Sequence, residues 1–112
     1  MWIIKALLLG SSVLCGTVAQ DLEISEFLAS NSAGEDWIEI HNTGNVSIDL
    51  AGVCLTDNEE SLNEWAFPSV TLGPNGYLVV FASGNDRVDS ELHTNFKLSA
   101  DGGYLALTDC AT

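Results

Sequence analysis

The chain has 112 residues, 46% of them hydrophobic, and its formal net charge at pH 7 is −13. This length predicts a single domain. Sixteen Asp and Glu against three Lys and Arg argue against a nucleic-acid partner and against an anionic membrane surface, because affinity for phosphate depends on basic side chains that displace counterions. The balance suits a soluble, exported protein that would attract cations.

Residues 1–20 have the pattern of a secretory signal peptide. Lys5 supplies the positive charge, an apolar region follows, and Thr17-Val18-Ala19 is a small-x-small cleavage site. A membrane anchor is the weaker alternative, because a helix from Ala6 to Ala19 would span about 21 Å, less than the ~30 Å hydrocarbon core. A bacterial lipoprotein signal at Cys15 would want a small residue where Leu14 stands. We therefore predict cleavage before Gln20 or Asp21 and a secreted or cell-envelope location.

The mature chain, residues 21–112, shows the patterns of short strands. The clearest is Asp36–Asn42, in which Ile38 and Ile40 alternate with polar and aromatic residues. Turn residues follow, including Gly44, and they predict a hairpin from this strand to Val46–Leu50. Other expected strands are Leu22–Ala29, Val53–Thr56, Glu64–Phe67, Val70–Leu72, Phe96–Leu98 and Tyr104–Thr108.

Two further segments complete the pattern. Tyr77–Phe81 is almost continuously apolar and predicts a strand buried on both faces. Gly73–Gly76 has Pro at its second position and Gly at its fourth, which predicts a type I turn. Polar loops are expected at Ser30–Glu35, Asp57–Asn63 and Ala82–Asn95. About eight short strands without helical periodicity predict an all-β antiparallel sandwich.

Several of these segments, in order, carry a family resemblance. The matching pieces are Ile24–Asn31, Asp36–Ile40 with Asn42 and Gly44, Asp49–Gly52, Leu55–Asp57, Trp65, Phe67-Pro68, Tyr77–Gly84, Leu92–Leu98 and Gly103–Leu107. The chain resembles the lamin-tail domain as it occurs in secreted bacterial proteins. The resemblance implies an immunoglobulin-like β-sandwich without catalytic residues, which accompanies secreted hydrolases, nucleases or kinase-like domains. It also suggests a fragment of a longer protein. Cys54 departs from the family, which often carries an aromatic residue there.

The sequence shows no catalytic motif. His41 and His93 have no partner that the sequence places beside them, and no G-x-S-x-G, H-E-x-x-H, phosphate-binding loop or C-x-x-C is present. We therefore expect no catalytic residue, no cofactor and no metal site. Calcium is the weaker alternative, because two acidic segments offer hard oxygen ligands. These segments are Asp57-Asn58-Glu59-Glu60, and Asp86 with Asp89 and Glu91.

The sequence leaves open the pairing of two cysteines and the role of five aromatic residues. The mature chain keeps Cys54 and Cys110; export would permit a disulfide between them, which requires Cα atoms within about 7 Å. Five aromatic residues form either framework packing or a platform for carbohydrate, and packing is the stronger interpretation. They are Trp37, Trp65, Phe67, Tyr77 and Phe81.

These patterns predict a non-catalytic accessory binding or spacer module of an exported protein. Its partner would be an extracellular or cell-envelope protein or polymer, or a neighbouring domain, and not nucleic acid or membrane. Loops on a rigid scaffold usually carry binding residues, so the contact surface is expected on Asp57–Asn63 and Gly84–Thr94, with Arg87 the one base among their acids. The alternative is a fragment of a metal-dependent secreted hydrolase that uses these acidic loops.

Overall fold

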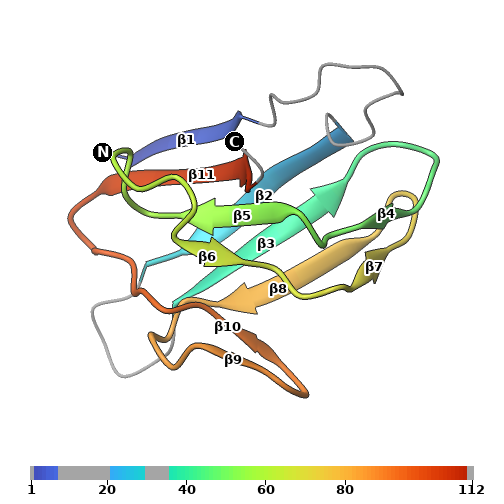
Figure 1. Ribbon diagram of the computed structural model, residues 1–112. Helices are drawn as coiled ribbons and strands as arrows, with labels where there is room; N and C mark the ends of the chain where they lie inside the picture. The colour runs from blue at the N-terminus through green and yellow to red at the C-terminus, as the bar shows by residue number, and fades with distance from the viewer. Residues whose placement is uncertain (1, 8–20, 30–35, 111–112) are drawn as a thin grey trace.

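The computed structural model describes residues 2–7, 21–29 and 36–110, and Figure 1 shows them as two facing layers of strands. The strands are β1 (Trp2–Leu7), β2 (Leu22–Leu28), β3 (Trp37–Asn42), β4 (Ile48–Asp49), β5 (Val53–Thr56), β6 (Trp65–Ala66), β7 (Thr71–Leu72), β8 (Tyr77–Phe81), β9 (Arg87–Val88), β10 (Leu92–His93) and β11 (Gly103–Asp109). One sheet has the order β1-β11-β5-β6 and the other β2-β3-β8-β10-β9, while β4 and β7 form a small third pair. The all-β sandwich is confirmed.

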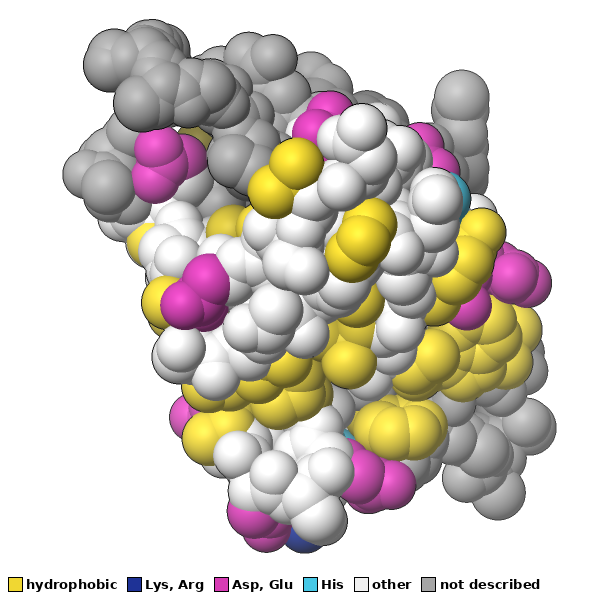
Figure 2. All heavy atoms as spheres, turned by 90° about the vertical axis from the view of Figure 1, so that its right-hand side faces the viewer, with side chains coloured by type: hydrophobic (Ala, Val, Ile, Leu, Met, Phe, Trp, Pro, Cys, Tyr) yellow, Lys and Arg dark blue, Asp and Glu magenta, His cyan; other side chains and the backbone are white. Residues whose placement is uncertain are grey.

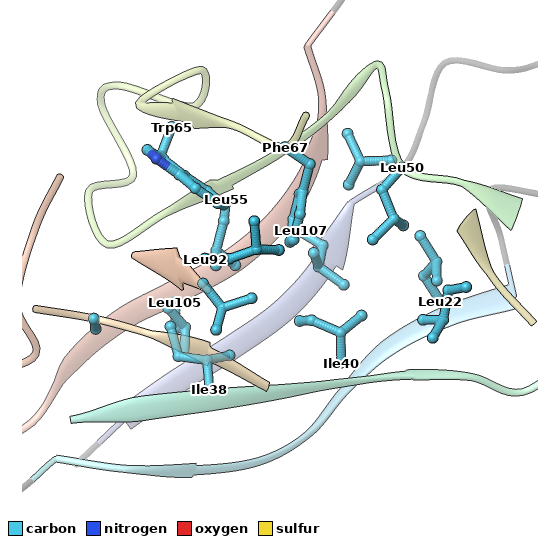
Figure 3. Packing of buried hydrophobic residues seen from close by; sticks show 14 of the residues in the cluster. Leu22, Ile38, Ile40, Leu50, Leu55, Trp65, Phe67, Leu92, Leu105 and Leu107 are labelled. Carbon is cyan, nitrogen blue, oxygen red and sulfur yellow. The ribbon is translucent and has the colours of Figure 1, made fainter. Parts of the chain in front are cut away.

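The space between the two layers is filled by apolar side chains from both sheets (Figure 3). Ile38 and Ile40 of β3 face Leu55, Leu105 and Leu107 from the opposite sheet, and all five are fully buried. Fully burying one such side chain contributes roughly 1.5–3 kcal/mol. The alternation predicted for β3 is therefore confirmed, because Trp37, Glu39 and His41 alternate with these buried residues and are only partly buried.

The hairpin predicted after β3 is wrong. β3 pairs with β2 and β8, whereas β4 pairs with β7, so the chain leaves the sheet after Asn42. Asn42 is fully buried, and its amide nitrogen donates to the carbonyl oxygens of Val46 at 2.8 Å, Gly73 at 3.0 Å and Leu72 at 3.1 Å. These bonds take the place of the backbone hydrogen bonds that a hairpin would have made. The side chain of Asn42 therefore sets the path of the chain between β3 and β4.

Two other local predictions are also wrong. β8 is not buried on both faces: Val80 is fully buried, but Tyr77 is 58% and Val79 40% exposed. Its outward residues are apolar, which is why the run looked like a buried strand. The turn at Gly73–Gly76 closes with a hydrogen bond from Gly76 N–H to Gly73 O, but Asn75 has φ of 59°. A positive φ at the third position is the mark of a type II turn rather than type I.

The first described residues form a strand inside the segment predicted to be a leader. β1 pairs with β11 in parallel over six consecutive positions, from Trp2 opposite Gly103 to Leu7 opposite Thr108. Figure 1 shows β1 along the outer edge of β11. The predicted cleavage site at Thr17–Ala19 and the predicted loop at Ser30–Glu35 lie outside the described residues. No helix in the described part of the chain is long and apolar enough to cross a membrane.

Candidate functional site

The first candidate contact loop, Asp57–Asn63, is organised around Thr56 at the end of β5. The Thr56 hydroxyl is fully buried and accepts the Asn58 N–H at 3.0 Å. Its oxygen lies 2.7 Å from the carbonyl of Ser61 and 3.0 Å from Glu64 Oε1. Glu60 N–H donates to the Asn58 side chain at 2.9 Å. The loop is therefore held from its inside, and the carboxylates of Glu59 and Glu60 remain exposed.

Asp57 and Glu64 form a carboxyl pair at the base of this loop. Partial burial, together with the hydrogen bond and charge of Glu64, raises the pKa of Asp57 to about 7. The Asp57 N–H also donates to Glu64 Oε1 at 3.3 Å. Near neutral pH, Asp57 is therefore divided between its neutral and charged forms, and the loop carries less negative charge than its composition implies.

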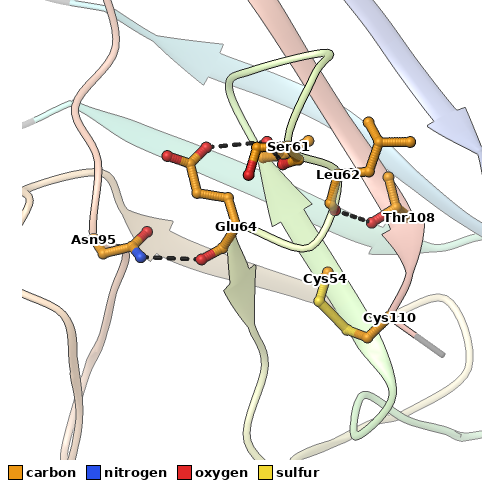
Figure 4. Close-up of a disulfide and its surroundings, with 8 residues drawn as sticks. Cys54, Ser61, Leu62, Glu64, Asn95, Thr108 and Cys110 are labelled. Atoms are coloured by element: carbon orange, nitrogen blue, oxygen red, sulfur yellow. Dashed lines mark hydrogen bonds between the residues drawn. A yellow bond between two sulfur atoms is a disulfide. The ribbon is translucent and has the colours of Figure 1, made fainter. Parts of the chain in front are cut away.

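The loop is fastened to β11 and to the second half of the chain (Figure 4). Thr108 Oγ1 donates to the Leu62 carbonyl at 2.6 Å, and Asn95 Nδ2 donates to the Glu64 carbonyl at 3.0 Å. Nearby, Cys54 of β5 and Cys110, directly after β11, are joined by a disulfide with Cα atoms 5.2 Å apart. This spacing lies within the range that a disulfide spans.

The second candidate loop, Gly84–Thr94, contains two short strands, β9 and β10, where the sequence predicted only a polar loop. β10 pairs with β8 in parallel and with β9 in the antiparallel sense. Leu92 supplies the apolar residue that draws this segment onto the core, since it is 8% exposed. Arg87 donates to both oxygens of Asp89, at 3.0 and 3.2 Å, and the guanidinium holds the pKa of Asp89 below its ordinary value.

The two loops flank the same short strand, β6. Trp65 of β6 donates from Nε1 to Asp86 Oδ1 at 3.1 Å, while Asn95, just after the second loop, donates to Glu64, just before Trp65. The carboxylates at the loop tips do not converge. Within residues 2–7, 21–29 and 36–110, no three His, Cys, Asp or Glu side chains are arranged to hold a metal ion. The structure thus joins the loops at their bases and keeps their acids apart.

A chain of hydrogen bonds that the sequence did not reveal runs through His93. Ser83 Oγ lies 2.8 Å from His93 Nδ1, and His93 Nε2 lies 3.2 Å from Glu91 Oε1. Asn85 N–H donates to Ser83 Oγ at 3.1 Å and extends this network to the backbone. The set has the residue types of a Ser-His-acid triad, but His93 is only 3% exposed and is stacked on Phe81 at 5.2 Å. Ser83, His93 and Glu91 therefore form a hydrogen-bonded clasp that joins the end of β8 to β10.

The aromatic residues divide between the core and the outer face of the β2-β3-β8 sheet. Trp65 and Phe67 are each 4% exposed and pack edge to face, with ring centroids 5.0 Å apart. Tyr77 lies outside and is stacked on His41 at 4.1 Å, and His41 Nδ1 lies 3.3 Å from Glu23. Packing therefore accounts for Trp65 and Phe67, while Tyr77 lies in solvent.

The molecular surface reflects the acidic composition. Figure 2 shows carboxylates scattered over one face of the molecule, with basic colour only at its lower rim, and apolar side chains gathered in the lower half. After Lys5, the only bases of the sequence are Arg87 and Lys97. Such a surface attracts cationic groups and repels phosphate.

Comparison with known proteins bears on the family alone. The model of the lamin tail domain family matches residues 16–112. Searches among curated proteins and among solved structures find no significant match. The match covers most of the chain and agrees with the resemblance carried by the strands β2, β3 and β8 and by the segments that follow them. The chain therefore belongs to the lamin tail domain family, whose members are non-catalytic immunoglobulin-like domains.

Proposed function

We propose that this chain is a non-catalytic contact module of an exported protein. Its leader, residues 1–20, is removed before Gln20 or Asp21, and the mature domain binds a basic extracellular or cell-envelope protein or polymer, or a neighbouring domain of its own chain. The binding surface comprises the loops Asp57–Asn63 and Gly84–Thr94. The domain binds neither nucleic acid nor membrane lipid and uses no cofactor.

The observation that carries the proposal is the attachment of both acidic loops to β6. Hydrogen bonds from Trp65 to Asp86 and from Asn95 to Glu64 hold the loops in fixed positions. Loops that are already ordered lose less conformational entropy on binding. The exposed acids Glu59 and Glu60 lie on the first loop, so charge complementarity favours a cationic partner.

The proposal is tested by retention on immobilised cationic and anionic polymers as the salt concentration is raised. We expect retention on the cationic polymer, weakened by the double substitution Glu59→Gln with Glu60→Gln. The matched control is Glu23→Gln with Glu26→Gln, which removes two exposed carboxylates from β2 instead. Equal loss in the two variants would show a general effect of charge and would contradict a loop-specific surface.

The hydrolase alternative is tested on the same purified protein. Ester, phosphodiester and glycoside substrates are supplied with and without divalent metal, and we expect no turnover. Metal-dependent turnover that is abolished by Asp57→Ala or Glu60→Ala would establish the acidic loops as an active site. Metal-independent ester cleavage that is lost in Ser83→Ala would instead identify the Ser83–His93–Glu91 clasp as a nucleophile with its base. Either result would overturn the contact module.

A further inference from the structure

Four strand edges bound the two main sheets, and three carry features that discourage pairing with another chain. β2 has a register shift between Ile24 and Glu26, which leaves Ser25 as a bulge. β6 and β9 are two residues long; Pro68 closely follows β6, and β9 contains Arg87. Bulges, short length, proline and charge are the usual means by which proteins protect sheet edges.

The fourth edge is β1, which covers the edge of β11. β11 has seven residues, Gly103–Asp109, and it pairs with β1 over six of them without a register shift. β5, on its other side, pairs only with Ala106–Asp109. In the described ladders, Gly103, Tyr104 and Leu105 therefore have partners in β1 alone. β1 is the protection of this edge, and the family match begins at residue 16, after β1.

β1 also borders a pocket between the two sheets. Ile4 is 38% exposed and lines this pocket of about 360 Å³ with Ile24 and Phe27 of β2, where Ser25 and Glu26 complete the wall. Ile24 and Phe27 are themselves packed against the main core. Removal of β1 would take away one wall of the pocket and uncover Ile24 and Phe27 beside a regular strand edge.

We propose that the outer edge of β11, with Ile24 and Phe27, is an acceptor site for one extended strand of a partner protein. This inference rests on the leader removal included in the proposed function. The partner strand takes the place of Trp2–Leu7 in parallel register, its backbone pairs with Gly103–Thr108, and an apolar side chain at the position of Ile4 restores the pocket wall with Ile24 and Phe27. Pairing through the backbone supplies affinity, and the apolar side-chain contact supplies specificity. A basic flank on the partner strand would complement the acidic domain.

The probe is a fluorescent peptide with the sequence of Trp2–Leu7, followed by anisotropy. It is titrated against three proteins: the full chain, the full chain with Ile4→Asp, and the exported protein, whose N-terminus is determined by mass spectrometry. We expect binding to the exported protein and to the Ile4→Asp chain but not to the full chain, whose own β1 fills the site. A peptide with Ile4→Asp should bind about tenfold more weakly, because it loses one partly buried apolar side chain.

Two further measurements locate the peptide. Amide exchange should slow at Gly103–Thr108 when the peptide is added and stay unchanged in β9. Phe27→Ala in the exported protein should weaken peptide binding, whereas Leu28→Ala, which truncates an adjacent side chain that is 46% exposed, should not. Near-UV circular dichroism, to which the buried Trp65 contributes, reports whether each variant keeps its fold.

The possible results distinguish a failure of the proposed acceptor site from a failure of the proposed leader removal. An exported protein that begins at Met1 contradicts leader removal, and the Ile4→Asp chain then still decides whether the acceptor exists. A folded exported protein that lacks residues 1–19 and leaves the peptide unbound overturns the acceptor. So does binding without protection of β11, or equal binding of the two peptides.

Discussion

Asn42 shows how one side chain decides the route of the backbone. The residue follows a strand that alternates regularly, and turn residues follow it, so a hairpin was the simplest prediction. Its amide instead bonds the carbonyls of Val46, Leu72 and Gly73, while its Oδ1 accepts the Gly44 N–H at 3.0 Å. The alternation of Ile38 and Ile40 is local and could be predicted. Two of the partners of Asn42, Leu72 and Gly73, lie 30 and 31 residues away, and no local pattern predicts them.

Substitution of Asn42 should be among the most destabilising polar changes in the chain. Asn42→Ala removes the donor that the carbonyls of Val46, Leu72 and Gly73 share, and each buried group left unsatisfied costs about 1–3 kcal/mol. Asn42→Asp keeps the shape but places a carboxylate oxygen against the same carbonyls, so we expect it to be no more stable than Asn42→Ala. Urea denaturation gives both values. Asn95→Ala, which removes a bond made at an exposed position, is the control, and an equally small loss in all three would contradict the role of Asn42.

Asp57 makes stability depend on pH in a direction opposite to that of a salt-bridged acid. Its pKa rises from 3.8 to about 7 in the folded protein, so the folded state holds this proton where the unfolded state has released it. The resulting stabilisation is full below about pH 4 and is lost as the pH rises through 7. Asp57→Asn should therefore flatten the profile of Tm between pH 5 and 8 and raise Tm at pH 8. Glu59→Gln, on the exposed part of the loop, should leave the slope intact; an unchanged slope in Asp57→Asn would refute the assignment.

The histidine clasp marks the limit of residue-level prediction. Ser83 and His93 are ten residues apart in a segment that contains many polar residues. They meet because β10 joins β8 in parallel, with His93 opposite Phe81. A two-residue strand carries too little alternation for its pairing to be recognised from the sequence.

At the scale of elements, most strands lie where the sequence placed them. The alternation of polar and apolar residues marked β3, and apolar runs between turn residues marked β5, β6, β7 and β8. β9 and β10 were missed because each has two residues and lies in a long polar stretch that offers no such contrast. β1 was assigned to the leader because its apolar run fits a leader as well as a strand, and only the ladder with β11 distinguishes the strand.

The Cys54–Cys110 disulfide links β5 to the end of β11 across 56 residues. The sequence left this pairing open, because spacing alone does not bring two cysteines together. In the chain-entropy account, closing a loop of this length stabilises the fold by about 4 kcal/mol. Reduction, or Cys54→Ser with Cys110→Ser, should lower the free energy of unfolding by up to this amount in urea titrations. Equal stability of the oxidised and reduced proteins would show that the ladder between β5 and β11 suffices.

At the scale of the whole molecule, the strongly negative charge raises the question of cation binding. We expect 1 mM Ca²⁺ to leave Tm nearly unchanged, because the loop acids do not converge within the described residues. A site with a Kd of about 10 μM would add about 2.7 kcal/mol at that concentration and raise Tm by several degrees. Thermal melts with Ca²⁺ and with excess chelator decide between these outcomes, and Mg²⁺ at the same ionic strength is the control.

The pairing of β1 with β11 also has a consequence for the order in which the protein is made. Trp2 lies opposite Gly103, a separation of 103 − 2 = 101 residues, so the ladder joins two segments that are made far apart in time. Until the ribosome has added β11, residues 2–7 lack the strand with which they pair in the fold. Any factor that binds residues 2–7 before β11 is made therefore meets them unpaired, whereas one that acts afterwards meets them as part of a sheet.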